Sequence, residues 1–238
     1  TAIRRRHLGP HCLLPAAQAW PIIETMDRRT IVSFVEKGIQ APSGDNLQPW
    51  RFRLEAEAVR LYLDLDRCRE FFNVECRPSL VSVGAVIENM AIAASAAGCA
   101  APTQYFPEGD SPASAVAHVT FQPASIPQDP LFPYIEKRAT NRKFYRPKAL
   151  PEKTLSSLRQ AGAVEGRTRL TLVTEPRDKR GLARWIGAAD RIRFEIKELH
   201  HDLFHALRFG KEEAERCRDG LDVRTFEIGP AGEALFRC

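Results

Sequence analysis

Apolar residues recur at helical spacing over residues 27–40, which predicts an amphipathic helix there. Residues 51–66 alternate between apolar and polar positions on either side of residue 56, which predicts a β-hairpin or two short strands. Residues 80–98 form a long apolar run rich in glycine and alanine. Because Glu88 and Asn89 sit near its middle and a charge is costly in lipid, this run indicates a buried interface helix rather than a membrane span.

The rest of the chain predicts a mixture of helices and short strands. The expected elements are a strand at 114–123, a proline-rich connection around one short helix at 128–150, a helix at 151–162, a strand at 169–174, a long helix at 179–208 and a shorter helix from 211 that ends before Gly220. Residues 1–20 look like an irregular lead-in, and we expect 21–238 to form a single domain. The strands at 116–121 and 170–173 should lie in one sheet.

An internal echo connects two of the predicted helices. "TIVSFVEKGIQ" begins at Thr30 and "TLSSLRQAGAV" begins at Thr154, and each leads through a loop into a predicted strand. Three identities at matched hydrophobic spacing are weak evidence. Internal duplication and chance similarity between two amphipathic helices both remain open.

Composition narrows the class of protein only slightly. The 238 residues are 44% hydrophobic, an ordinary globular balance. The formal net charge of +5 could serve binding to nucleic acid, binding to an anionic cofactor, or solubility alone. The six cysteines are scattered, so a zinc site is not expected. His201 and His205 lie four apart on a predicted helix, where a surface or packing role is expected. An arginine cluster followed by Gly9 and Pro10 does not read as a signal peptide, so a cytoplasmic protein is expected.

Two short segments carry the candidate chemistry. The first, "APSGDNLQPW" at 41–50, puts small residues, two side-chain amides and Trp50 into one connection, and we expect Trp50 to pack beneath the loop. The second, "KRATNRKFYRPK" at 137–148, is strongly basic. On a helical turn Arg138 and Arg142 would share a face, and two guanidinium groups beside the Thr140 hydroxyl would suit a phosphate monoester. A solvated basic surface is the alternative interpretation.

These segments resemble the signatures of the nitroreductase family. "APSGDNLQPWRF" is similar to that family's A-P-S-x-x-N-x-Q-P-W-x-F motif, "KRATNRKFYRPKALP" to its Arg-Arg-Ser-x-Arg-x-F phosphate motif, and "SVGAVIENMAIAASAAG" to its central interface helix. The resemblance covers about residues 28–162. Thr140 stands where the family usually has Ser.

The resemblance implies an α+β, nitroreductase-like fold, with a mixed, mostly antiparallel sheet flanked by helices on both faces. It also implies an FMN site, with NAD(P)H as electron donor and a nitroaromatic, quinone or similar small molecule as acceptor. The residues that it assigns to the cofactor are Pro42, Ser43, Gly44, Asn46, Gln48, Arg138, Thr140 and Arg142. No side chain is expected to act as a general acid or base, and neither a metal, nucleic acid nor a membrane is expected as a partner.

The order of the motifs departs from the ordinary family, in which the arginine motif comes first. The order found here resembles the divergent Acg-like branch and the nitroreductase domains fused to ThiF-type domains. A homodimer, or a monomer that imitates a dimer by duplication, is therefore expected. "RDGL" at 218–221 is also similar to text of that branch.

The chain stops at Arg237-Cys238, before the family's last strand or lid, so we expect a domain truncated at its C-terminal end. The leading hypothesis is an FMN-dependent oxidoreductase. Its alternatives are a flavin-binding or degenerate domain with little turnover, perhaps within a larger fusion protein, and a polyanion-binding module built on residues 137–148.

Overall fold

The protein is described here from a computed structural model, which describes residues 26–229 and 232 apart from 69–72, 110, 112, 143–144 and 164–167. Its first half is built on a four-stranded sheet of order β1-β2-β5-β4, in which neighbouring strands are antiparallel. The strands are β1 (Trp50–Leu54), β2 (Ala58–Leu63), β4 (Thr103–Tyr105) and β5 (Ala117–Thr120). The predicted hairpin is confirmed, with Trp50 opposite Leu63 and Leu54 opposite Val59.

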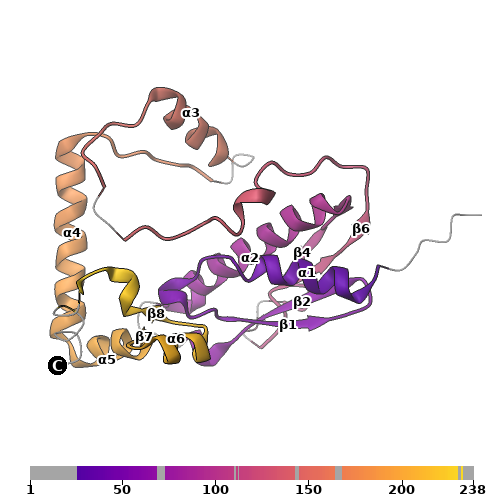
Figure 1. Ribbon diagram of the computed structural model, residues 1–238, viewed down its shortest axis with the longest axis horizontal. Helices are drawn as coiled ribbons and strands as arrows, with labels where there is room; N and C mark the ends of the chain where they lie inside the picture. Colours follow the sequence, from indigo (N-terminus) through magenta and orange to yellow (C-terminus); the bar gives the residue numbers. More distant parts are fainter. Residues whose placement is uncertain are drawn as a thin grey trace, which may run out of the picture.

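Two helices, α1 (Arg28–Gly38) and α2 (Arg77–Ala96), pack against one face of this sheet (Figure 1). The core between them is apolar because alternate strand residues point toward the helices. Its main side chains are Ile31, Phe34, Val59, Leu61, Val86, Met90, Val119 and Phe121. The α+β class and the mostly antiparallel sheet are therefore confirmed.

The opposite face of the sheet is polar rather than covered by a second helical layer. It carries an ion pair between Arg60 and Glu55, a contact between His118 and Glu55, and the exposed side chains of Arg51 and Arg53. The expectation of helices on both faces is therefore wrong for the described residues. The alternation along β1 and β2 leaves these polar positions pointing to solvent.

α2 is the predicted interface helix, and it packs mainly against α1. The segment Val74–Ala96 is long and apolar enough to cross a membrane by length and composition alone, but 56% of its most apolar window is buried within the protein. The two helices pack closely at Gly38 of α1, where an added Cβ would lie 2.7 Å from Met90 Cγ. Gly84 of α2 instead faces open space.

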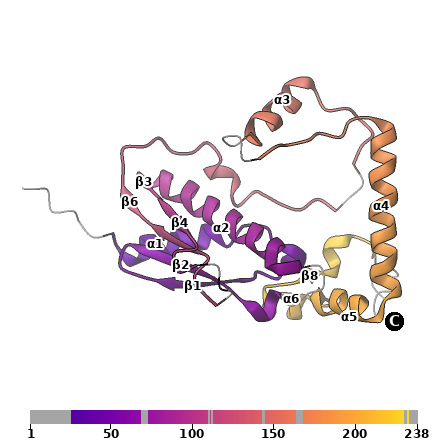
Figure 2. The same ribbon diagram turned by 180° about the vertical axis from the view of Figure 1, so that it is seen from behind.

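The second half of the chain is helical and more extended. Its elements are η4 (Phe132–Tyr134), α3 (Glu152–Ala161), α4 (Pro176–Glu195), α5 (Lys197–Ala206), β7 (Leu207–Arg208), α6 (Lys211–Cys217), β8 (Leu221–Asp222) and η5 (Val223–Phe226). Short elements in the first half are η1 (Gly44–Asn46), η2 (Leu65–Cys68), η3 (Val74–Cys76), β3 (Cys99–Ala100) and β6 (Gln122–Pro123). α3 and α4 stand apart from the sheet in both views, and α6 is drawn between α5 and the sheet (Figures 1 and 2).

Two predictions for this half are wrong. Residues 168–175 are not a strand, so they do not join β5 in one sheet, and the second copy of the internal echo leads into no strand among its described residues. The long helix is broken at Ile196, whose backbone is extended (φ −94°, ψ 120°). The break turns α5 so that Leu199, Leu203 and Ala206 become buried, and that burial outweighs the helical pattern of the sequence.

The Gly38 contact gives a direct test of the α1–α2 packing. Gly38→Ala should destabilise the protein by about 1–3 kcal/mol, because its Cβ would press into Met90 and Val86 in a filled core. The free energy of unfolding in urea measures this. Gly84→Ala is the matched control: with open space around it, it should be neutral or stabilising by up to about 1 kcal/mol. Equal effects of the two changes would refute the close packing at Gly38.

Candidate functional site

The loop after α1 has an unusual backbone. Asp45, Asn46 and Gln48 all have positive φ, at 42°, 55° and 51°, in the left-handed region that side chains other than glycine rarely adopt. Local hydrogen bonds support this shape: the Gln48 N–H donates to Ser43 Oγ at 3.0 Å, and the Asn46 N–H donates to the Ser43 carbonyl at 3.1 Å. Such conformations persist only where their surroundings hold them.

Trp50 lies directly after this loop and begins β1. It is 8% exposed and belongs to the main core. The prediction that it packs beneath the loop is therefore confirmed. Its burial anchors one end of the loop to the sheet.

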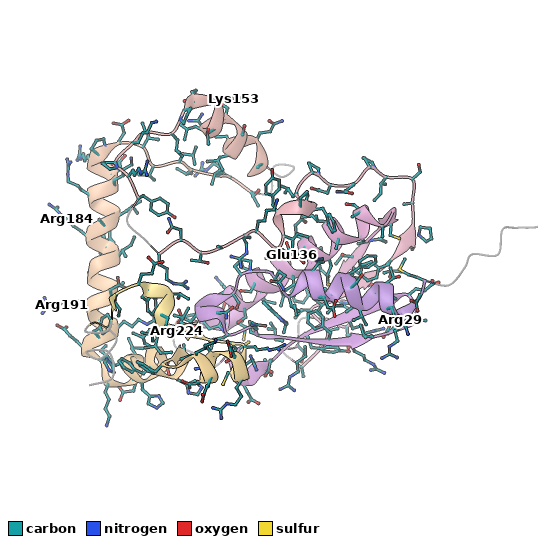
Figure 3. The ribbon with its side chains drawn as sticks, in the orientation of Figure 1. Arg29, Glu136, Lys153, Arg184, Arg191 and Arg224 are labelled. Carbon is teal, nitrogen blue, oxygen red and sulfur yellow. The ribbon has the colours of Figure 1, made fainter. Side chains whose placement is uncertain are left out.

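The basic segment approaches the same loop from about ninety residues later. Residues 138–142 form no helix or other regular structure, so the expected helical turn is wrong. Arg138 is instead placed by its guanidinium group, which donates to the Gln40 carbonyl at 3.2 and 3.3 Å. An ion pair between Glu136 and Lys37 fixes the start of the segment over the C-terminal end of α1 (Figure 3).

One cavity of about 630 Å³ contains residues from both segments. Of the eight predicted site residues it is lined by Pro42, Ser43, Asn46, Arg138, Thr140 and Arg142. Its volume lies in the ordinary range for small-molecule and cofactor sites. The two segments therefore meet within a single chain, although nothing local in the sequence requires it.

The C-terminal helices complete this cavity with residues that the sequence did not single out. They are Asp190, Arg193, Phe194, Leu203, Leu207, Gly220, Leu221, Asp222, Thr225 and Phe226. Phe226 lies under the Arg142 guanidinium, 5.5 Å from its ring centroid, and this cation–π contact helps to orient Arg142. The only sequence signal for this wall was the "RDGL" similarity, because cavity-facing apolar residues look like ordinary core residues in a sequence.

Two of the cavity's carboxylates are neutralised by neighbouring arginines. Arg193 donates to Asp45 at 2.7 Å, and Arg224 on η5, labelled in Figure 3, forms an ion pair with Asp222 at 2.5 Å. The hydrogen bond from Arg224 lowers the pKa of Asp222, so this carboxyl is ionised at neutral pH. The contacts made by Arg138 and Arg142, to a carbonyl and to a ring, leave their positive charges in place for an anionic group.

Two predicted residues are placed differently. Gly44 lines two smaller neighbouring cavities, of about 230 and 340 Å³, rather than the main one. Gln48 lies outside the main cavity, and its side-chain amide donates to the Arg218 carbonyl at 2.6 Å. The Asn46 amide borders the cavity, but it donates to the Gly220 carbonyl at 3.0 Å.

Charged side chains stabilise the loop and the neighbouring 218–220 segment through hydrogen bonds and ion pairs. Arg67 on η2 donates to the Leu47 carbonyl at 2.7 Å and pairs with Asp219 at 3.0 Å, while Arg208 pairs with the same carboxylate at 2.8 Å. Asp64, which is 8% exposed, accepts two hydrogen bonds of 3.0 Å from Arg51 and lies 3.6 Å from Arg67. The loop, η2 and the 218–220 segment therefore form one connected polar network.

Comparison with known proteins finds relatives that match over part of their length. No family model matches it. A Mycobacterium tuberculosis (strain CDC 1551 / Oshkosh) protein provisionally named NAD(P)H nitroreductase acg is 37% identical over 96 residues, which cover 40% of this chain and 29% of that protein. The chain is a nitroreductase-family homologue. The motifs at 41–52 and 137–151 agree with this assignment, and six of their residues meet in one cavity.

A second relative of the chain is a longer protein than the first. The uncharacterised protein MT1398 from the same mycobacterial strain is 29% identical over 195 residues, which cover 81% of this chain and 26% of that protein. The chain therefore spans less than a third of the length of the curated relatives that it matches.

Solved structures give weaker likenesses. One is a protein provisionally called a nitroreductase from Desulfovibrio desulfuricans, in complex with FMN: 21% identity, TM-score 0.35, covering 47% of this chain and 84% of that one. Another is a nitroreductase family protein from Streptococcus pneumoniae TIGR4: 14% identity, TM-score 0.34, covering 56% and 90%. At such TM-scores the fold class rests on the strand order and helix packing of the chain itself.

The network beneath the loop should depend on pH in a defined direction. Burial alone would raise the pKa of Asp64, but the hydrogen bonds from Arg51 and from the Asp66 backbone, together with the charges of Arg51 and Arg67, outweigh it and lower the pKa. The ionised carboxylate therefore stabilises the fold above about pH 4, the ordinary aspartate value, and this stabilisation is lost as the pH falls through the lowered pKa.

Asp64→Asn should accordingly cost about 1 kcal/mol or less at pH 7, as expected for a partly exposed ion pair, and the difference from the unaltered protein should shrink at pH 3. Urea unfolding at the two pH values measures it. Asp66→Asn, on the short helix η2 that directly follows Asp64, is the control. A cost that is the same at both pH values would show that Asp64 acts through shape rather than charge.

Proposed function

We propose that the chain forms the FMN-binding unit of a nitroreductase-type NAD(P)H oxidoreductase. The observation that carries this proposal is the shared cavity, where Ser43 and Asn46 from the first motif face Arg138, Thr140 and Arg142 from the second. The ring and the phosphate of one FMN molecule need anchors on the order of 10 Å apart, since only a short ribityl chain joins them. That one cavity is lined by both motifs supports this proposal.

The residues present fit the phosphate end of FMN well. Arg138 and Arg142 supply guanidinium donors, which bind phosphate oxygens through charge-assisted hydrogen bonds, and the Thr140 hydroxyl adds a neutral donor. Arg142 is already oriented by Phe226. Because the Arg142 side chain is ordered before FMN binds, binding loses less side-chain conformational entropy.

The cavity also offers apolar and polar side chains that would suit an aromatic ring. Phe194, Leu203 and Leu207 provide apolar wall, and Ser43 and Asn46 provide polar groups at its edge. Bound FMN would supply the redox chemistry, taking a hydride from NAD(P)H and passing electrons to an acceptor such as a quinone or nitroaromatic. The protein's own contribution is to position the ring, to neutralise the phosphate and to keep water away from the ring face.

The direct test is spectroscopic and then kinetic. The purified chain, incubated with FMN and desalted, should retain flavin absorbance, and it should oxidise NADPH in the presence of a quinone. Retained flavin without turnover would favour the flavin-holding alternative, which the short coverage of the relatives also allows. Absence of bound flavin at saturating FMN would overturn the proposal.

The phosphate clamp can be tested by a single substitution. Arg142→Ala should weaken FMN by roughly 10- to 150-fold, which corresponds to about 1.5–3 kcal/mol for a hydrogen bond to a charged group. Affinity for riboflavin, which has no phosphate, should barely change. Fluorescence titration with both ligands gives the comparison.

Arg146→Ala is the matched control, because this exposed arginine of the same segment does not line the cavity. It should change neither affinity by more than about twofold, the scale of an exposed surface charge. If Arg142→Ala reduced FMN and riboflavin affinity equally, Arg142 would support the fold rather than the phosphate.

A further inference from the structure

The turn formed by Arg218, Asp219 and Gly220, called here the 218–220 turn, docks directly on the candidate flavin loop. Three hydrogen bonds join them: Asn46 Nδ2 to the Gly220 carbonyl at 3.0 Å, the Gly220 N–H to the Asn46 carbonyl at 2.9 Å, and Gln48 Nε2 to the Arg218 carbonyl at 2.6 Å. The partners lie about 170 residues apart in the sequence. Both amide side chains that the family motif would offer to a ligand are thus engaged by the protein backbone.

The turn is shaped for this contact. Gly220 has φ +73°, and a Cβ at this position would lie 2.5 Å from the Ala206 carbonyl oxygen, so only glycine fits. Arg218 also has a positive φ of 55°. Asp219 is held between Arg67 and Arg208, at 3.0 and 2.8 Å, and these ion pairs keep the turn against η2.

The loop in turn depends on support of this kind. Asp45, Asn46 and Gln48 each hold a left-handed backbone that is unfavourable unless surrounding contacts fix it. Two of these three residues make the hydrogen bonds to the turn. The strained backbone and the contacts that hold it therefore occur at the same positions.

We propose that Gln48 and Asn46 are positioning residues, which clamp the 218–220 turn, and that the turn fixes the shape of the flavin loop. Gln48 acts on a ligand only through this contact, because it lies outside the cavity. This inference deepens the proposed function and rests on it for the identity of the ligand, FMN. All the contacts of the clamp lie within the chain, so it can be measured separately from ligand binding.

Amide hydrogen exchange of the 238-residue chain, without flavin, tests the clamp. Gln48→Glu keeps the shape of the side chain but replaces the donating amide with a carboxylate, which repels the Arg218 carbonyl. Exchange at Gly220 should speed up by roughly tenfold or more, the scale of a lost hydrogen bond to a carbonyl. Gln160→Glu, at an exposed position on α3, is the matched control and should leave that amide unchanged.

The reciprocal change tests whether the turn fixes the loop. Gly220→Ala, or Asp219→Asn if that variant does not fold, should speed exchange at Asn46 and Leu47. When Gln48→Glu and Gly220→Ala are combined in a double-mutant cycle, exchange should speed up by less than the product of their separate effects, because both changes break one contact. Unchanged loop exchange, or fully multiplicative effects, would overturn the inference.

Flavin titration then separates a positioning role from a direct contact. Gln48→Glu should weaken FMN and riboflavin by the same factor, since the clamp shapes the loop that both ligands would share. Weaker flavin binding with unchanged exchange at Gly220 would make Gln48 a direct ligand and overturn the inference. If the unaltered chain binds no flavin, the proposed function fails, while the exchange experiments still decide the clamp.

Discussion

The pairing of Asn46 with Gly220 is the contact on which the arrangement of the site depends. Two backbone and side-chain hydrogen bonds there join the first half of the chain to the last quarter, and the Arg67–Asp219–Arg208 ion cluster reinforces them. Because the contact brings β8 and η5 beside the loop, Leu221 and Phe226 become a wall of the cavity. Arg142, which lies over Phe226, is placed through the same contact.

The stability of the two halves has different origins. The sheet with α1 and α2 encloses a conventional apolar core, in which Ile31, Val59 and Met90 are fully buried. Among the described residues of the second half, the apolar core is a small cluster around Leu207, Leu221 and Val223, and α3 and α4 contain no buried residue. In Figure 3, Arg184 and Arg191 on α4 point away from the rest of the protein. Polar contacts to the loop therefore hold the second half in place, whereas apolar burial stabilises the first half.

The candidate site shows the same division. Arg138, Thr140 and Arg142 line the cavity, and the two arginines bring positive charge to it. The side-chain amides of Asn46 and Gln48 instead donate to the backbone of the 218–220 turn. The chain has kept the residue types of the motif, while part of their hydrogen-bonding capacity serves to hold the chain together.

The sequence by itself determined the elements whose stability is local: α1, the β1–β2 hairpin, α2 and α3 follow from periodicity, and Trp50 was expected in the core. It also singled out six residues that share the cavity, because the two motifs are short and distinctive. Only the tertiary structure decided the break at Ile196, the loss of the expected strand at 169–174 and the roles of Asn46 and Gln48. Each of these depends on contacts between distant residues, and a local hydrophobic pattern carries no information about which carbonyl a side-chain amide will meet.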